Sequence, residues 1–195
     1  TEKWNGTNWT NVNSLNTARS YLSGCGASNT AALAVGGNIP PSQSLTESYN
    51  GTNWTNVNSM NTARSYLAGC GASNTAALAF SGSDGSSLRN DTETWNGTNW
   101  TEVNNLNSGR VKIQNSGCGT QTAALLAGGA NPTSTAVTDT EIWNGTNWTE
   151  VNNLNAARYG IGSAGTSTAA LAASGFSPPY NTAVEIWNGT NWTEV

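Results

Sequence analysis

A repeated hexapeptide constrains the fold of this chain more than any other feature of the sequence. Trp-Asn-Gly-Thr-Asn-Trp, or its variant beginning with Tyr49, occupies residues 4–9, 49–54, 95–100, 143–148 and 187–192. Asn-Gly between strand-like residues favours a tight β-hairpin, because such turns need positive φ angles that Asn and Gly adopt at low cost. Each copy is therefore predicted to be a hairpin, with either a two-residue Asn-Gly loop or a four-residue Asn-Gly-Thr-Asn loop.

The hairpins belong to an internal repeat. The second Trp of the hairpin recurs at intervals of 45, 46, 48 and 44 residues, at Trp9, Trp54, Trp100, Trp148 and Trp192. A Glu stands seven residues before this Trp in the later copies, at Glu47, Glu93, Glu141 and Glu185. An Arg stands ten residues after the previous copy of the Trp, at Arg19, Arg64, Arg110 and Arg158. These constant distances indicate a rigid unit that is repeated along the chain.

Two more strands are predicted between successive hairpins. The first is the Arg segment, such as residues 18–22, because its third copy at 109–114 alternates β-branched and polar residues. Gly109 in that copy would also cost a helix about 1 kcal/mol relative to Ala. A glycine-rich turn is predicted at 24–26, followed by a second strand in the apolar run 30–37. The alanine-rich side of this run implies the close approach of a neighbouring sheet.

Four antiparallel strands in each repeat predict an all-β fold. One such unit cannot bury both faces alone and must stack on its neighbours, and radial stacking gives a β-propeller. A β-solenoid is the alternative, although its coils are usually shorter. The prediction is a single repeat domain over residues 1–195, with a surplus outer hairpin at 1–12 and four complete blades at about 19–57, 64–103, 110–151 and 158–195.

Three arrangements fit the surplus hairpin at residues 1–12. It could form an incomplete fifth position in a single-chain ring, pair with another copy of the chain, or mark a segment of a longer repeat array. The preferred prediction is the single-chain ring, in which the hairpin caps the blade 19–57 on one side and the blade 158–195 on the other. Self-association through the free strand edge of the hairpin is the alternative.

The repeat also resembles a known family. An Arg at the first strand, Gly-Gly after the second, Glu before an aromatic residue in the third and Trp in the fourth resemble the kelch repeat. Examples are Arg64, Gly36-Gly37, Glu47-Ser48-Tyr49 and Trp54. The amino-acid sequence of the repeats is similar to that of kelch-like repeats in structural and fibre-type proteins of marine bacteriophages. This resemblance implies a location on a virion or outside the cell. The chain departs from the kelch pattern at Ser81-Gly82 and Ser174-Gly175.

Composition restricts the partners of this chain. Only 9% of the residues are charged and the net charge is −4, so neutral Asn, Thr and Ser side chains supply most of the polar surface. Such a surface suits glycans or other protein surfaces. No run of Lys and Arg is present to neutralise phosphates, which argues against nucleic acid as a partner. No apolar run approaches the roughly 20 residues that cross a bilayer, so membrane insertion is not expected.

No motif predicts catalysis, a metal or a cofactor. The chain contains no His, and its repeated Glu residues are equivalent, so no two carboxylates have the distinct environments that acid–base catalysis needs. The Arg and Glu residues are predicted to form structural ion pairs. Cys25, Cys70 and Cys118 occupy equivalent predicted turns without ligand spacing, which indicates small buried thiols. The repeated Trp residues are predicted to pack between blades rather than to bind sugars.

The variable loops are the candidate binding site. Residues 38–45, 83–91, 130–139 and 176–183 differ in length and sequence and all join the second and third strands, so they should share one face. The candidate ligand-binding residues are Asn38, Gln43, Asp84, Arg89, Asn131 and Tyr180. The predicted function is a non-enzymatic structural and recognition module. A soluble multivalent lectin is the alternative, and an enzyme of the kelch-bearing oxidase type is a third hypothesis.

Overall fold

The fold is a row of four propeller-like blades that begins with an additional hairpin. The computed structural model describes residues 1–178 and 180–195, and within these ranges the chain is all-β and contains no helix. The described strands form four four-stranded antiparallel sheets and one two-stranded hairpin. The four predicted blades and the surplus hairpin are therefore confirmed.

Each blade has the same strand order, from an inner strand to an outer one. The N-terminal hairpin consists of β1 (Glu2–Trp4) and β2 (Trp9–Asn11). Blade 1 consists of β3 (Ser23–Ser28), β4 (Ala31–Val35), β5 (Thr46–Tyr49) and β6 (Trp54–Val57). Blade 2 consists of β7 (Ala68–Ser73), β8 (Ala76–Phe80), β9 (Thr92–Trp95) and β10 (Trp100–Val103).

The two remaining blades repeat this plan. Blade 3 consists of β11 (Gly117–Thr120), β12 (Ala123–Ala127), β13 (Thr140–Trp143) and β14 (Trp148–Val151). Blade 4 consists of β15 (Gly162–Gly165), β16 (Ala170–Ala173), β17 (Val184–Trp187) and β18 (Trp192–Glu194). Every neighbouring pair of strands within a blade is antiparallel.

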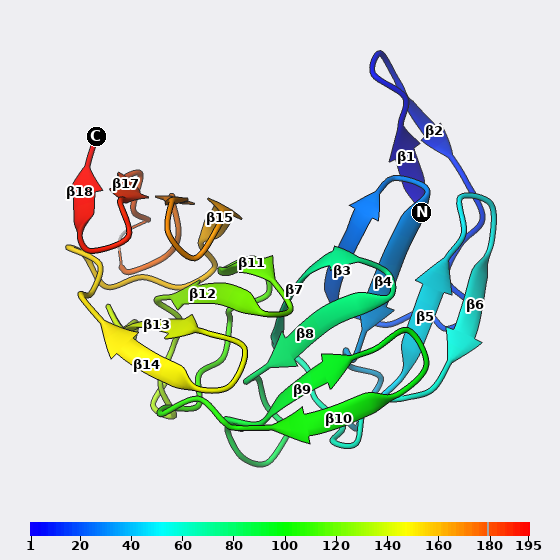
Figure 1. Ribbon diagram of the computed structural model, residues 1–195, viewed down its shortest axis with the longest axis horizontal. Coiled ribbons are helices and arrows are strands. Elements are labelled where there is room, and N and C mark those ends of the chain that lie inside the picture. Colours follow the sequence, from blue (N-terminus) through cyan, green and yellow to red (C-terminus); the bar gives the residue numbers. More distant parts are fainter. Residues whose placement is uncertain (179) are drawn as a thin grey trace.

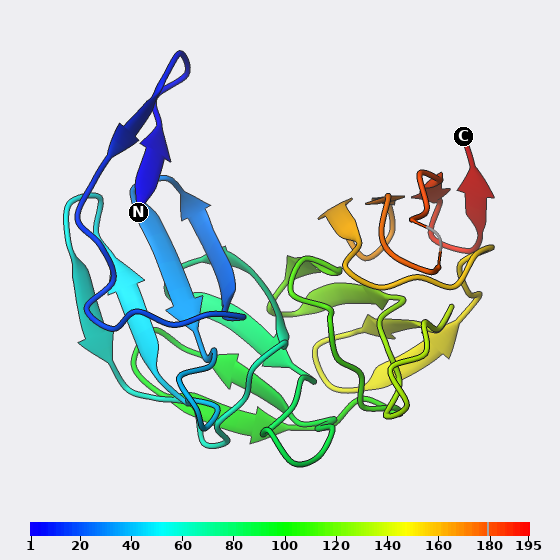
Figure 2. The same cartoon turned by 180° about the vertical axis from the view of Figure 1, so that it is seen from behind.

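The blades are arranged as an open arc around a common centre (Figures 1 and 2). The inner strands lie side by side near this centre, with β7 packed between β3 and β11, and β11 in contact with β15. The N-terminal hairpin stands at one end of the arc and blade 4 at the other, with a gap between them (Figure 1). The predicted single-chain ring is therefore wrong, because residues 1–12 lie beside blade 1 and not beside blade 4.

The hairpins use the four-residue loop, which decides between the two alternatives left by the sequence. In blade 2, Trp95 pairs directly with Trp100 across the loop. The side-chain oxygen of Asn96 accepts hydrogen bonds from the backbone N–H groups of Thr98 and Asn99, at 2.9 and 2.8 Å. Gly97 has a φ of 92°, a left-handed conformation that Gly adopts without strain. The hexapeptide thus encodes the complete turn.

The innermost strand of each blade lies later in the sequence than predicted. Residues 18–22 and 109–114, predicted as strands, are irregular, whereas the predicted turn at 24–26 lies within β3. Left-handed residues interrupt the Arg segment, for example Tyr21 with φ 53° and Lys112 with φ 60°. An extended strand cannot continue through this backbone conformation.

Close packing at the centre of the arc explains why glycine suits the inner strands. A Cβ atom added to Gly69 of β7 would lie 2.9 Å from the Ser23 hydroxyl oxygen of β3. A Cβ atom added to Gly117 of β11 would lie 2.7 Å from the Phe80 ring. Neighbouring blades therefore approach each other at positions where larger side chains would clash.

The apolar core consists of the three interfaces between successive blades. Between blades 2 and 3, Leu78 and Phe80 pack against Trp143 and Trp148. The interfaces of blades 1 and 2 and of blades 3 and 4 are built in the same way. The indole N–H of the second Trp donates to a Thr hydroxyl of the preceding blade, as Trp100 to Thr46, Trp148 to Thr92 and Trp192 to Thr140. The face of each blade that carries its Trp residues therefore packs against the preceding blade.

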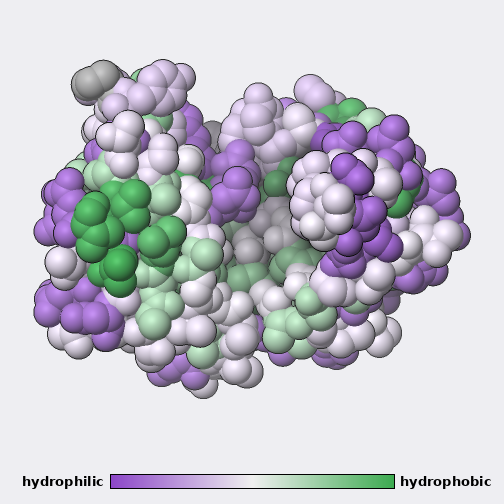
Figure 3. Space-filling model, turned by 90° about the horizontal axis from the view of Figure 1, so that it is seen from above, coloured by the Kyte–Doolittle hydropathy of each residue, from purple (hydrophilic) through white to green (hydrophobic). Residues whose placement is uncertain are grey.

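The two ends of the arc lack such partners. At the N-terminal end, Trp9 is 65% exposed, whereas Trp100 is 6% exposed. At the other end, Leu171 and Ile186 of blade 4 are exposed, although the equivalent Leu125 of blade 3 is fully buried. Figure 3 shows a hydrophobic patch on the side of the molecule that carries blade 4. Both ends therefore present apolar surface that internal blades bury.

Candidate functional site

The loops that join the second and third strands of the blades form one face of the molecule, which we call the loop face. They comprise residues 36–45, 81–91, 128–139, 174–178 and 180–183, and residue 179 of the predicted loop 176–183 lies outside the described residues. Because strand direction alternates within a blade, the connections between blades reach the same face, and the Asn-Gly hairpin tips lie on the opposite one. The loop face thus brings together the most variable parts of the repeat.

Two adjoining pockets on the loop face make up the region that we call the loop-face groove. A pocket of about 470 Å³ lies between the loops of blades 1 and 2, and one of about 170 Å³ between those of blades 2 and 3. Both pockets are lined by Tyr66 and Ser83, so they share a wall. The groove therefore crosses three successive blades.

Hydroxyl groups and one carboxylate dominate the larger pocket. The Ser42 hydroxyl lies 3.0 Å from the Ser65 hydroxyl and donates to the Ser83 carbonyl at 3.3 Å. The Asp84 carboxylate accepts backbone N–H groups of Ser86 and Ser87, both at 2.8 Å. These hydrogen bonds hold the pKa of Asp84 below its usual value, and the bond from Ser86 has the largest effect. The pocket therefore offers a carboxylate that is ionised at neutral pH beside neutral hydroxyl groups.

Aromatic side chains lie in and beside the loop-face groove. The Tyr21 and Tyr66 rings are stacked, with centroids 4.1 Å apart and planes 21° apart. The ammonium of Lys112, which lines the smaller pocket, lies 4.2 Å above the Tyr159 ring. Tyr21, Tyr66 and Lys112 occupy equivalent left-handed positions in three repeats. Tyr21 thus packs against one face of the Tyr66 ring, and Tyr66 lines the groove.

The structure brings only some of the predicted binding residues together. Asn38, Asp84 and Asn131 line the loop-face groove. Gln43 instead donates from its side-chain amide to the Ile39 and Pro41 carbonyls of its own loop, at 2.9 and 2.6 Å.

Arg89 and Tyr180 also lie outside the lining of the groove. Arg89 binds Asp91 at 2.7 Å and Asp84 at 3.6 Å. Tyr180 is 81% exposed and packs edge to face on Phe176, in blade 4. Tyr66 and Lys112 were not predicted as binding residues. Their only distinguishing feature in the sequence is that the residue type two positions after the repeated Arg differs between repeats.

The repeated Arg and Glu residues form buried ion pairs inside the blades. Arg64 binds Glu93 at 2.7 Å and Arg110 binds Glu141 at 2.6 Å, and the remaining pairs are Arg19 with Glu47 and Arg158 with Glu185. The second oxygen of Glu93 accepts the backbone N–H of Asn61 at 2.7 Å. Each pair thus fastens the chain segment that enters the blade to its third strand.

The cysteines lie in the inner strands β3, β7 and β11, so their predicted position in turns is wrong. Burial raises the pKa of the Cys25 thiol to about 12 and that of Cys118 to about 11. Neutral thiols are poor nucleophiles at physiological pH. In residues 1–178 and 180–195, no group of three or more His, Cys, Asp or Glu side chains is placed to hold a metal ion.

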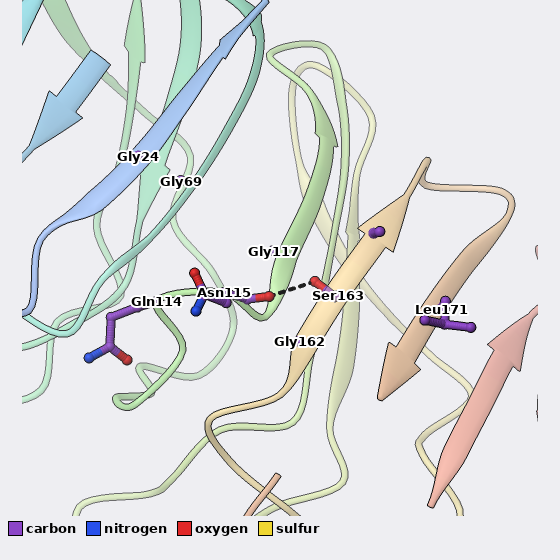
Figure 4. Close-up of a pocket in the computed structure, with 9 residues that line it drawn as sticks. Gly24, Gly69, Gln114, Asn115, Gly117, Gly162, Ser163 and Leu171 are labelled. Atoms are coloured by element: carbon purple, nitrogen blue, oxygen red, sulfur yellow. Dashed lines mark hydrogen bonds between the residues drawn. The ribbon is translucent and has the colours of Figure 1, made fainter. Parts of the chain in front are cut away.

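A further pocket of about 530 Å³ lies at the centre of the arc, between the inner strands (Figure 4). The inner strands contribute Gly24, Gly69, Gly117 and Gly162 to its wall. The Ser163 hydroxyl donates to the Asn115 carbonyl at 2.8 Å. Gln114, Asn115 and Ser163 also line this pocket, which is built from inner strands and their connections, whereas the variable loops line the loop-face groove.

No family model matches the chain, and no curated protein is significantly similar to it. Across the described part of the chain, the structure has no helix long and apolar enough to cross a membrane. The residues of the loop-face groove therefore provide the most direct basis for a functional proposal.

Proposed function

We propose that this chain is a non-enzymatic structural and recognition module that binds neutral polar ligands in the loop-face groove. The observation that carries the proposal is the position of the groove, which runs across the loops of three blades. These loops vary in length and sequence while the blades around them are nearly constant. Loops held by a rigid scaffold are where proteins commonly place recognition.

The chemistry of the groove indicates the class of ligand. Its lining combines Ser42, Ser65 and Ser83 with the amides of Asn38 and Asn131. Such groups exchange hydrogen bonds with hydroxyl-rich or amide-rich surfaces rather than with strongly charged ones. Neutral glycans and polar protein surfaces are therefore the proposed partners.

A soluble lectin is the second candidate, because one combination in the groove favours a sugar. The Tyr66 ring can stack on the apolar face of a sugar, and the Asp84 carboxylate can accept hydrogen bonds from two neighbouring hydroxyl groups. Stacking on Tyr21 holds the Tyr66 ring in place. Preorganised aromatic groups bind at a lower entropic cost than free ones.

A location on a virion or in a fibre is also proposed. The resemblance of the repeats to kelch-like repeats of marine bacteriophage fibre proteins supports it, as does the low charge of the chain. Detection of the chain in purified phage particles with a specific antibody tests this location directly. Absence of the chain from such particles would contradict the proposed location on a virion, but it would not contradict ligand binding by the groove.

Binding to an array of neutral oligosaccharides tests the groove itself. We expect Tyr66→Ala to weaken binding at least about tenfold, because it removes the stacking surface. Tyr180→Ala is the matched control, because Tyr180 is exposed on another blade, and it should leave binding unchanged. Equal loss in both variants would contradict the proposal. A hydrolase or oxidase activity abolished by one substitution would contradict the non-enzymatic assignment.

A further inference from the structure

One backbone position beside the loop-face groove carries side chains at a conformational cost. Two residues after the repeated Arg, the backbone is left-handed in all four repeats, with φ between 53 and 63°, at Tyr21, Tyr66, Lys112 and Gly160. Gly adopts this conformation without strain, whereas it is disfavoured for a residue with a Cβ atom. A Cβ atom added to Gly160 would meet no other atom within 4 Å, so packing does not require a side chain there. The three side chains that occupy this position are therefore candidates for a role in binding.

Lys112 differs from most other cationic residues in lacking a carboxylate partner. The chain has seven Lys and Arg residues, and each of the five Arg residues binds an Asp or a Glu. Among the described residues, only Lys3 and Lys112 form no such ion pair. Lys3 lies in β1, outside the groove, whereas Lys112 lines the smaller pocket. The positive charge of Lys112 is therefore available to a ligand.

An aromatic ring positions the Lys112 side chain at the pocket. Its ammonium lies 4.2 Å from the centre of the Tyr159 ring. Gly160, the residue after Tyr159, donates its backbone N–H to the Lys112 carbonyl at 2.9 Å. A cation–π contact attracts the ammonium without neutralising its charge. The smaller pocket thus presents a cation whose side chain and backbone are both held in place.

The other polar groups of the smaller pocket also donate hydrogen bonds. The Asn131 side-chain oxygen already accepts from the backbone N–H groups of Thr133 and Thr135, both at 3.0 Å. The Nδ2 group of Asn131 is therefore the part of this amide that remains for a ligand. Ser134 adds a hydroxyl group, and no Asp or Glu is among the described residues that line this pocket. The pocket therefore favours a ligand group that accepts hydrogen bonds and carries negative charge.

The larger pocket has the opposite electrostatic character. Asp84 lines it, and no Lys or Arg is among the described residues of its wall. Tyr66 lines both pockets, so the two regions meet at this residue. A carboxylate would be repelled by Asp84 and attracted by Lys112. The groove therefore distinguishes the two ends of a ligand by their charge.

We propose that the smaller pocket binds the carboxylate of an acidic sugar, of the uronic acid class, in a glycan whose neutral sugars occupy the larger pocket. This inference rests on the proposed binding of glycans by the loop-face groove. The smaller pocket measures about 170 Å³, below the roughly 300 Å³ of typical small-molecule sites, so it accommodates part of a ligand. One ammonium balances the charge of a carboxylate better than the larger charge of a phosphate. The Tyr66 ring provides the surface on which the adjoining sugar stacks.

Pairs of oligosaccharides that differ in one group test the proposal. One member is neutral, and in the other the terminal hydroxymethyl group is replaced by a carboxylate, as glucuronic acid differs from glucose. Calorimetric titration of the full chain should give a Kd lower by a factor of about three or more for the acidic member, the effect of one partly exposed ion pair. A salt concentration of about 1 M should reduce this preference, because the Debye length then falls to roughly 3 Å.

Variants of Lys112 connect the preference to the pocket. Lys112→Gln should bring the ratio of the two Kd values to about one, and Lys112→Arg should retain the preference because it keeps the charge. Lys3→Gln is the matched control, since it removes the same charge outside the groove, and it should leave the ratio unchanged. Urea denaturation of each variant checks that the fold is retained.

Equal Kd values for the two members in the unmodified chain would overturn the proposal, as would a preference that Lys112→Gln leaves intact or that Lys3→Gln also abolishes. Tighter binding of a peptide with a free terminal carboxylate than of the acidic glycan, lost in Lys112→Gln, would overturn it in favour of a polypeptide ligand. Equal binding of both glycans contradicts only this inference, whereas binding of neither contradicts the proposed glycan binding as well. The two failures are therefore distinguishable.

Discussion

The hairpins at residues 4–9 and 95–100 have identical sequences but different surroundings. Both pair their two Trp residues directly, and their ring centroids are 5.7 and 5.3 Å apart. Yet Trp9 is 65% exposed and Trp100 is 6% exposed. The hexapeptide therefore determines the hairpin, whereas the preceding blade determines how much the hairpin stabilises the fold.

The ion pairs show the same contrast. Glu93 is fully buried and binds Arg64, whereas Glu2 is exposed, although both stand seven residues before a hairpin Trp. The inner half of the blade is what supplies the Arg and excludes water. Equivalent substitutions in the N-terminal hairpin and in an internal blade should consequently have very different effects on stability.

The largest difference is expected from the ion pairs. Arg110→Gln should lower the free energy of unfolding by roughly 3–5 kcal/mol, because it leaves the buried Glu141 carboxylate without its charged partner. Glu2→Gln should change it by less than about 0.5 kcal/mol. Urea denaturation of both variants measures the two values. Equal values would mean that the buried pairs do not hold the blades together.

The aromatic residues should give the next largest difference. Trp100→Ala should cost about 3 kcal/mol or more, because it opens a cavity between blades 1 and 2. Trp9→Ala should cost less than about 0.5 kcal/mol, because Trp9 is mostly exposed. Thermal unfolding followed by circular dichroism ranks the two variants. A larger loss from Trp9→Ala would show that the hairpin contributes more than its exposure indicates.

A single hydrogen bond between blades should have a smaller effect. Thr92→Val should cost about 1 kcal/mol, because it leaves the buried indole N–H of Trp148 without the hydroxyl acceptor at 2.9 Å. Thr101→Val, on the exposed side of blade 2, is the matched control. The prediction fails if urea midpoints of the two variants coincide.

The pH dependence of stability should reveal the ion pair of blade 4. Burial of the Glu185 carboxyl raises its pKa, but hydrogen bonds from Asn155 and Arg158 outweigh this and lower the pKa below the ordinary value of 4.5. A lowered pKa stabilises the fold above the unfolded-state pKa, and this stabilisation is lost as the pH falls through the folded-state pKa. Glu185→Gln should therefore make stability less dependent on pH below about 4.5. Exposed Glu194→Gln should retain the dependence seen in the unmodified chain.

The smallest effect is expected in the variable loops. Ser86→Ala removes an exposed hydroxyl but leaves the backbone N–H that binds Asp84. The free energy of unfolding should change by less than about 0.5 kcal/mol. A loss comparable to that of Trp100→Ala in the same assay would show that the loops are part of the scaffold.

The sequence predicted those features that depend on local chemistry. The turn at residues 96–99 follows from Asn and Gly, and the apolar run at 30–37 contains β4. The inner strand at 23–28 was misplaced, because glycine is a poor strand former by propensity and is favoured there only by the neighbouring blades. The left-handed backbone at Tyr66 cannot be read from its residue type, so its place in the groove was missed. The closed ring was wrongly predicted because no sequence pattern encodes the angle between blades.

Because the hairpins are nearly identical in sequence, the length of the connection between strands affects which hairpin completes which blade. Every hairpin presents the same Glu and Trp positions, so on sequence alone neighbouring hairpins can compete for one inner strand pair during folding. The loop 36–45 joins β4 to its own hairpin, whereas the hairpin of blade 2 begins only at Thr92. Closing the longer connection costs about 1.5 kcal/mol more in chain entropy. The loops that vary most in sequence therefore also select which hairpin completes each blade, and a long insertion in one of them would weaken that selection.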